Sequence, residues 1–214
     1  FSFYYAHHMT TIEGGMISTN SKKIDILAKM KRGHGLLRDS QDKSFIKKIK
    51  MKNKDLNSDF IFCTEGFNLR NDELSAVIGL EQIKRLDQNI KKRNYNHKLF
   101  LKNLRNDIFF KDFNLAGSSN YGLHLILRKK NKKLFIKILK ILELNSIEYR
   151  IGSAGGGNQL RQPYLKKFRK KFNFRKFTNT EHMHFYSLYI GNYPELNRSK
   201  IINLCKILNS INIS

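Results

Sequence analysis

A short polar stretch near the start of the chain combines side chains suited to proton transfer with one suited to phosphate binding. His7 and His8 follow Ser2 within six residues, and Gly14-Gly15 closes the stretch. An imidazole takes up and releases a proton near neutral pH, which suits a general acid or base. A serine hydroxyl before a turn is able to donate a hydrogen bond to a phosphate oxygen. This stretch is therefore the first candidate for the site of chemistry, while His8 is expected to pack or to bond the backbone.

A second candidate set consists of one histidine and two arginines. His34 lies between Gly33 and Gly35, a position that does not suit a core residue, and we therefore expect a functional role. Arg38 and Arg70 carry guanidinium groups, which bind carboxylates and phosphates in a bidentate manner. The alternative interpretation for each arginine is a surface salt bridge.

Metal and disulfide chemistry receive little support from the sequence. His182 and His184 have metal-like spacing, but no third ligand lies nearby, so we expect a pair at a strand edge and no metal. Cys63 and Cys205 lie far apart without a CxxC motif, which excludes a disulfide framework and a four-cysteine metal site within one chain. Free thiols are typical of a reducing compartment, so the cytoplasm is expected.

Hydrophobic periodicity predicts the elements that position these residues. Apolar residues at three- and four-residue spacing predict helices, and short alternating runs predict strands. Ser21 is expected to cap the first helix, and Asn71 or Asp72 the longest one. The predicted elements are strands at 1–5 and 15–18, a helix at 22–31, a surface loop at 40–59, a long helix at 71–105, a strand at 121–127, a helix at 134–144, strands at 147–151 and 185–190, and a helix at 195–208.

The bulk properties bound the class of protein. The 214 residues suffice for one or two domains with a real core. No apolar run reaches the roughly 18 residues that a membrane-spanning helix needs, and no signal peptide is recognisable. Because the pattern begins inside a strand without a methionine, we expect the chain to be a fragment.

The net charge of +24 could indicate a nucleic-acid or membrane-surface binder. The basic residues are spread along the chain, and the densest runs, at 129–133 and 166–176, lie between periodic segments. This spread favours solvated surface lysines. We therefore expect no nucleic-acid and no membrane partner, although the positive field would steer an anionic substrate toward the protein.

The first polar stretch, S-F-Y-Y-A-H-H-M-T-T-I-E-G-G at 2–15, resembles a pattern of the DegT/DnrJ/EryC1/StrS sugar aminotransferases. The family pattern is close to S-F-x-x-x-K-x-x-T-T-x-E-G-G, and His7 stands at its lysine. Further blocks follow in register, at 33–39, 66–82, 158–163 and 189–192. Five ordered blocks cover nearly the whole chain, so chance is a poor explanation for the resemblance.

The resemblance implies an α/β fold, namely the C-terminal part of the aspartate-aminotransferase-like, PLP-dependent transferase fold (fold type I), with a small α+β domain at its C-terminal end. Residues 1–105 would form the remainder of the large PLP-binding domain, including the long linking helix, and residues 106–214 the small C-terminal α/β domain. Family members carry a further segment upstream, with the aspartate that pairs with the pyridine nitrogen. This sequence has no candidate for that aspartate, so the fragment alone is expected to be inactive.

The change from lysine to His7 implies a change of reaction. Lysine tethers the cofactor, pyridoxal 5'-phosphate (PLP), covalently, and imidazole cannot do so. Pyridoxamine 5'-phosphate (PMP) is then the expected resting form, and the His-His pair resembles the family's 3-dehydratases, which remove the C3 hydroxyl of nucleotide-linked 4-keto-6-deoxy sugars. One such branch, acting on CDP-sugars, needs an iron–sulfur cluster and about four thiolates. With two cysteines, this chain is closer to the GDP-sugar branch, in which L-glutamate regenerates the amine and no cluster is expected.

The resemblance also implies roles for individual residues. Asn68 would reach the cofactor phosphate from the neighbouring subunit, which implies a homodimer with shared active sites. Glu148 matches a sugar-contacting carboxylate by spacing only. The implied catalytic residues are His7 and His34; the implied cofactor-binding residues are Ser2, His7 and Asn68; and the implied substrate-binding residues are His34, Arg38, Arg70, Glu148, Asn158 and Arg161.

Three alternatives stay open at this point. The chain could be an ordinary sugar aminotransferase that has lost its lysine but keeps the fold. It could be a decayed protein in which His7 is a neutral change, although Ser2, Thr10, Glu13 and the glycine pair remain intact. It could also be a non-catalytic nucleic-acid-binding module driven by charge, which would bind DNA with a steep dependence on salt.

Overall fold

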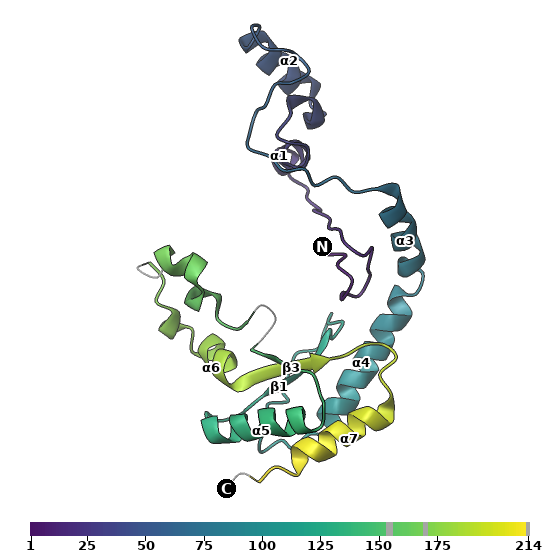
Figure 1. Cartoon of the computed structure of the whole chain (residues 1–214), viewed down its shortest axis with the longest axis vertical. Helices are drawn as coiled ribbons and strands as arrows, with labels where there is room; N and C mark the ends of the chain where they lie inside the picture. Colours follow the sequence, from purple (N-terminus) through teal and green to yellow (C-terminus); the bar gives the residue numbers. More distant parts are fainter. Residues whose placement is uncertain (153–155, 169–170, 213–214) are drawn as a thin grey trace. The chain divides into compact units, whose positions relative to one another are not determined.

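The computed structural model describes residues 1–152, 156–168 and 171–212 (Figure 1). The chain forms two compact units, Phe1–Leu86 and Asp87–Ser214. The chain is a mixed α/β structure, as predicted. The predicted division after residue 105 concerns a larger domain and stays a prediction; within this chain the boundary between the units lies at 86/87. No helix of the described ranges is long and apolar enough to cross a membrane.

The first unit contains the helices α1 (Lys22–Arg32), α2 (Lys43–Lys52) and α3 (Glu73–Ile83), with a short 3-10 helix at Leu37–Ser40. The predicted helix at 22–31 is confirmed, and the Ser21 side chain caps it by accepting from the Ile24 amide. The predicted strands at 1–5 and 15–18 are reduced to a single bridge between Ser2 and Gly15.

The predicted surface loop at 40–59 is wrong, because it contains the helix α2. The Asp42 side chain caps this helix by accepting from the Phe45 amide at 2.9 Å. This hydrogen bond is the main cause that holds the pKa of the Asp42 carboxyl below its usual range. Lysine is a good helix former, so a lysine-rich segment with one cap forms a helix despite its polarity.

The predicted long helix at 71–105 is two helices. Asp72 caps α3, as expected, through the Ser75 amide at 2.7 Å. The helical run is interrupted at Lys84 and Arg85, and α4 (Leu86–Asn103) follows and lies almost entirely in the second unit. The apolar periodicity runs through this break and therefore conceals it.

The second unit is built on a three-stranded antiparallel sheet of order β1-β3-β2. Its strands are β1 (Gly122–Ile126), β2 (Arg150–Ile151) and β3 (Ser187–Gly191), with Leu123 opposite Ile190 and Ile151 opposite Leu188. The helices α5 (Lys132–Leu144) and α7 (Arg198–Asn209) lie beside this sheet (Figure 1). The core combines residues from α4, the sheet and both helices, among them Phe100, Leu123, Ile138, Leu142, Leu188, Ile201 and Leu208.

Two predicted strands in this unit were too long. The strand predicted at 147–151 comprises only Arg150–Ile151. The strand predicted at 185–190 begins at Ser187, because Phe185 and Tyr186 end the helix α6 (Thr178–Tyr186). The Leu127 amide donates to the Tyr186 carbonyl at 3.0 Å and marks the point at which the helix passes into the strand.

His182 and His184 consequently lie on α6, and the predicted strand-edge pair is wrong. A nitrogen of His182 contacts the Leu127 carbonyl at 2.5 Å. The His184 ring accepts from the Asn158 amide at 3.1 Å. Across the ranges that the structure describes, no group of three or more potential metal-ligating side chains is found.

His97 on α4 gives this unit a dependence on pH. Its side chain is 2% exposed, and neither ring nitrogen has a hydrogen-bond partner among the described residues. Burial, with a contribution from His124, lowers the pKa of His97 to about 4. The unfolded chain takes up this proton first as the pH falls, so the stabilisation is complete above about pH 6.5 and is lost progressively toward pH 4.

We expect the free energy of unfolding to fall by about 3 kcal/mol through His97 between pH 7 and pH 4. In the variant His97→Phe this contribution should disappear. Urea denaturation followed by circular dichroism, at several pH values in this range, measures both proteins. An equally steep fall in the variant would contradict the assignment to His97.

Candidate functional site

The N-terminal stretch folds back on itself and places a loop between its ends. The Phe3 amide donates to the Gly14 carbonyl, and the Thr11 amide donates to the Phe3 carbonyl, each at 2.9 Å. Gly14 has φ +141°, and a Cβ atom there would lie 2.8 Å from the Thr11 hydroxyl oxygen. Gly14 is therefore required by its backbone conformation, and the hydrogen bonds of Phe3 with Gly14 and Thr11 hold the loop that carries His7.

Ser2 and His7 lie on a common hollow of about 360 Å³ within the first unit. The remaining lining residues are Phe1, Phe3, His8, Met9 and Leu86. The His7 amide donates to the Tyr4 carbonyl at 3.0 Å, so that a tight turn presents the imidazole, which is exposed. The structure thus brings together the predicted acid–base residue and the predicted phosphate-binding hydroxyl.

His34 and Asn68 are brought together by backbone pairing between two distant segments. Gly33 and Asn68 form an antiparallel bridge, and the His34 amide donates to the Phe67 carbonyl at 2.8 Å. Gly35 has φ +83°, and a Cβ atom there would lie 1.8 Å from the Thr64 carbonyl oxygen. The two segments of the chain approach so closely that only glycine fits at position 35. His34 itself adopts φ +63°.

A second hollow of about 450 Å³ collects four of the predicted residues, His34, Arg38, Asn68 and Arg70. The other lining residues are Leu36, Phe60 and Phe62, and no carboxylate lines the hollow in the part of the chain that the structure describes. The Arg38 guanidinium lies 5.2 Å from the centre of the Phe60 ring. Two guanidinium groups, an imidazole and an amide form a donor set that suits phosphate or carboxylate groups.

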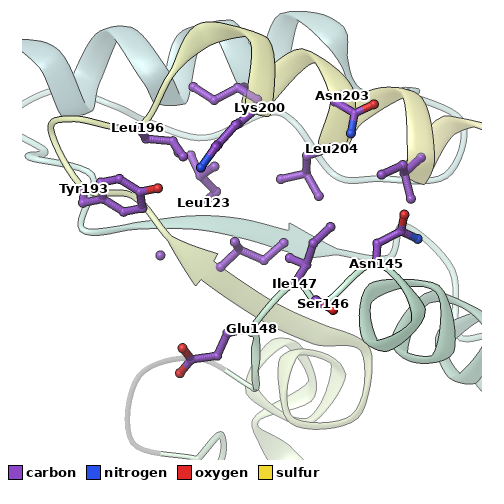
Figure 2. Close-up of a pocket in the computed structure, with 14 residues that line it drawn as sticks. Leu123, Asn145, Ser146, Ile147, Glu148, Tyr193, Leu196, Lys200, Asn203 and Leu204 are labelled. Carbon is purple, nitrogen blue, oxygen red and sulfur yellow. The ribbon is translucent and has the colours of Figure 1, made fainter.

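Glu148 lies at the edge of a different hollow, in the second unit (Figure 2). This hollow of about 500 Å³ lies between α7, the sheet and the turn that follows α5. Its floor is mainly apolar, and Figure 2 shows the Glu148 carboxylate directed away from Leu123 and Leu204. The predicted contact of Glu148 with a sugar stays a prediction, although polar side chains such as Asn145, Lys200 and Asn203 also line this hollow.

Asn158 and Arg161 converge on a carboxylate that sequence reasoning missed. The Asn158 side-chain amide donates to Glu181 at 2.7 Å, and Arg161 donates to both Glu181 oxygens, at 2.8 and 2.5 Å. The Arg161 guanidinium also lies between the rings of Phe174 and Phe185, at 4.5 and 4.8 Å. These contacts fasten the segment after β2 to α6. Arg161 and Glu181 lie 20 residues apart in an aperiodic region, so the sequence offers no signal for their pairing. The nucleotide contacts predicted for Asn158 and Arg161 stay predictions.

The hydrogen bond from Arg161 is the main cause that lowers the pKa of Glu181. A lowered pKa means that the carboxylate stabilises the fold above the usual pKa of glutamate, and that this stabilisation is lost as the pH falls. We expect Glu181→Gln to reduce the free energy of unfolding by about 1–3 kcal/mol at pH 7, since a partly buried bidentate pair is broken. Thermal and chemical denaturation measure this loss.

A matched control is available in Glu81, which pairs with Lys84 on the surface of α3 at 2.5 Å. Both of these side chains are exposed, so Glu81→Gln should change the stability by less than about 0.5 kcal/mol. Equal effects of the two substitutions would contradict the structural role of Glu181.

A family model and several known proteins match most of this chain. The model of the "DegT/DnrJ/EryC1/StrS aminotransferase family" matches residues 1–209. GDP-4-keto-6-deoxy-D-mannose 3-dehydratase of Escherichia coli O55:H7 is 28% identical over 194 residues, which cover 90% of this chain and 49% of that protein. The chain thus spans about half the length of this relative.

Two solved structures show the same fold. The Escherichia coli GDP-4-keto-6-deoxy-D-mannose-3-dehydratase with bound hydrated PLP is 26% identical and has a TM-score of 0.73. A variant of GDP-4-keto-6-deoxymannose-3-dehydratase with bound GDP-perosamine is also 26% identical, with a TM-score of 0.76. Each alignment covers 97% of this chain and 53% of the other. The fold is therefore that of PLP-dependent, aminotransferase-like proteins of fold type I, as predicted.

Proposed function

Because this chain belongs to the DegT/DnrJ/EryC1/StrS aminotransferase family, we propose that it is part of a nucleotide-sugar 3-dehydratase. The expected substrate is a nucleotide-linked 4-keto-6-deoxyhexose, with GDP-4-keto-6-deoxymannose as the first candidate. The observation that carries this proposal is the imidazole of His7, which stands at the lysine of the family pattern and shares a hollow with Ser2.

The residues of the two hollows fit the PLP or PMP cofactor. The Ser2 hydroxyl and the Asn68 amide are the kind of donors that would hold the cofactor phosphate. When bound, the cofactor supplies a ring that accepts electrons from the sugar. The cationic set of His34, Arg38 and Arg70 suits the anionic substrates, among them the diphosphate of a nucleotide sugar.

His7 performs the proton transfers in this proposal. One ring nitrogen would take up the proton that the amine form of the bound cofactor releases, and would deliver it to the C3 hydroxyl, which leaves as water. Imidazole has no primary amine with which to hold the cofactor covalently, so the amine form remains free to react and elimination prevails over amine donation. His34 and the two arginines next to it would bind the carboxylates of L-glutamate, which regenerates the amine.

A homodimer with shared active sites completes the proposal. The hollow of His34, Arg38, Asn68 and Arg70 is distinct from the hollow of Ser2 and His7. In a dimer, one subunit would supply the first hollow and its partner the second, so that both act on the same ligand. The apolar side chains of α3, Leu74, Val77, Leu80 and Ile83, are 56–78% exposed. Such a helix requires cover from further chain or from a second copy. The free cysteines and the substrate class favour the cytoplasm, where the product would feed dideoxysugar and surface-polysaccharide synthesis.

Product analysis tests the function. The longest natural form of this polypeptide is incubated with PMP, L-glutamate and GDP-4-keto-6-deoxymannose, and the sugar product is identified by mass spectrometry. A sugar that has lost the C3 hydroxyl supports the dehydratase. An amino sugar would assign the protein to the sugar aminotransferases of the same family and would overturn the proposal.

A further inference from the structure

Residues 163–177, here called the basic–aromatic segment, differ in composition from the rest of the chain. They contain seven of the 41 Lys and Arg residues, against about three for an even spread. No Asp or Glu occurs in the sequence between Glu148 and Glu181. The cations alternate with the aromatic residues Tyr164, Phe168, Phe172, Phe174 and Phe177. General lysine richness explains neither the missing acids nor the interleaved aromatic rings.

Four of the five aromatic side chains of this segment face solvent. Tyr164, Phe168, Phe172 and Phe177 are 65%, 41%, 44% and 48% exposed. They stand on and beside two short 3-10 helices, Pro163–Phe168 and Phe174–Lys176. A soluble surface normally exposes such residues singly, and a group of them among cations indicates an interaction surface.

Phe174 connects the segment to the fold, and within the described part of the chain no ion pair joins the segment to an acid. Phe174 lies under the Arg161 guanidinium at 4.5 Å, and Arg161 is in turn paired with Glu181. Glu181 is the first carboxylate that follows the segment in the sequence, and its charge is taken up by this pair. Among the residues that the structure describes, the exposed Lys166, Lys167 and Lys171 form no ion pair and present a positive face.

We propose that the basic–aromatic segment docks the protein on an anionic phospholipid surface. Clustered lysines are attracted by the negative surface potential of such a bilayer, and exposed phenylalanine rings enter the headgroup region beside them. Docking of this kind needs no spanning helix. The proposed docking differs from the expectation of no membrane partner. That expectation depended on the lack of a membrane-spanning apolar run and on the spread of basic residues along the chain.

The ring contacts favour lipid over single-stranded nucleic acid. The Lys167 ammonium lies 5.2 Å from the centre of the Phe168 ring, and the Lys171 ammonium lies 5.5 Å from that of Phe172. Base stacking uses a free ring face. Insertion into a headgroup layer needs only the apolar ring beside a cation, which is the arrangement that these two pairs provide.

Vesicle co-sedimentation tests the proposal with the full chain. Binding is measured to phosphatidylcholine vesicles and to vesicles in which roughly a third of the lipid is phosphatidylglycerol. The variant K166Q/K167Q/K171Q should bind the anionic vesicles at least tenfold more weakly, since each cation near such a surface contributes roughly fivefold. The control K129Q/K130Q/K132Q removes three exposed lysines from a run without interleaved aromatic residues and should lose less than about threefold.

A second variant separates insertion from charge. F168S/F172S keeps every cation and removes two exposed rings, so its melting temperature should be unchanged while anionic-vesicle binding falls about tenfold. Equal binding to neutral vesicles, or equal loss in the lysine control, would overturn the proposal. If a single-stranded oligonucleotide displaces the protein from the vesicles at a concentration below that of the anionic lipid, the segment would be assigned to nucleic acid instead.

Discussion

Replacement of His7 by Asn is expected to lower the rate of C3 dehydration by about 10²- to 10⁴-fold, with little change in the KM for the nucleotide sugar. Asparagine is close to imidazole in size but transfers no proton at neutral pH. His7 lies on an exposed turn, so its removal should leave the fold intact. Steady-state kinetics on the longest natural form of the polypeptide, with circular dichroism as a check of folding, measure the effect.

His7→Lys provides the complementary variant. It restores the residue of the family pattern, and a primary amine at this position should hold the cofactor covalently. With PLP, whose aldehyde condenses with the lysine amine and releases water, borohydride reduction should leave a mass increase of one PLP less one oxygen atom, and dehydration should be lost. Full dehydratase activity of His7→Asn would contradict the role of His7, whether or not His7→Lys captures the cofactor.

Replacement of Gly35 by Ala is expected to disrupt the segment that positions His34 and Asn68. The added Cβ would lie 1.8 Å from the Thr64 carbonyl oxygen, a clash with backbone that no side-chain rotation relieves. The positive φ of +83° adds strain of about 1–2 kcal/mol. We expect a total loss of more than about 3 kcal/mol, and rapid proteolysis of the segment around residues 33–69.

Gly117→Ala is the matched control, since Gly117 also has a positive φ, of +69°, but its Cβ would meet nothing within 4 Å. This substitution should cost only about 1 kcal/mol, the conformational part of the effect. Limited proteolysis and hydrogen exchange report on each unit separately. If Gly35→Ala proves as mild as Gly117→Ala, the close approach of the two segments is not present in solution.

The elements predicted well from the sequence combine strong periodicity with a recognisable cap. The helix α1 has the Ser21 cap, and α5 and α7 bury their apolar faces against the sheet. The helix α2 was missed because its lysines resemble a loop in composition, although Asp42 caps it. The break between α3 and α4 was missed because an apolar pattern continues through Lys84 and Arg85, where the helical run is interrupted. Local composition is a weak guide where tertiary contacts or a single cap decide the outcome.

In the candidate site too, contacts within one stretch of sequence were easier to predict than contacts between segments far apart in the chain. Ser2 and His7 share a hollow because they belong to one folded-back stretch, whose Gly-Gly pair is visible in the sequence. His34 and Asn68 lie 34 residues apart in the chain, and the bridge between Gly33 and Asn68 brings them to one hollow. The roles predicted for them came from the family resemblance, but their proximity follows from backbone hydrogen bonds that no periodicity in the sequence indicates.

The amino-acid sequence by itself determined the family and placed an imidazole, His7, at the lysine of the family pattern. It could do so because the type and short-range spacing of side chains are read directly from the sequence. Only the tertiary structure decided that His34, Arg38, Asn68 and Arg70 line one hollow, and that Arg161 and Asn158 are engaged by Glu181. The physical reason is that such contacts depend on close backbone approach and on burial, which arise only when segments distant in the sequence pack together.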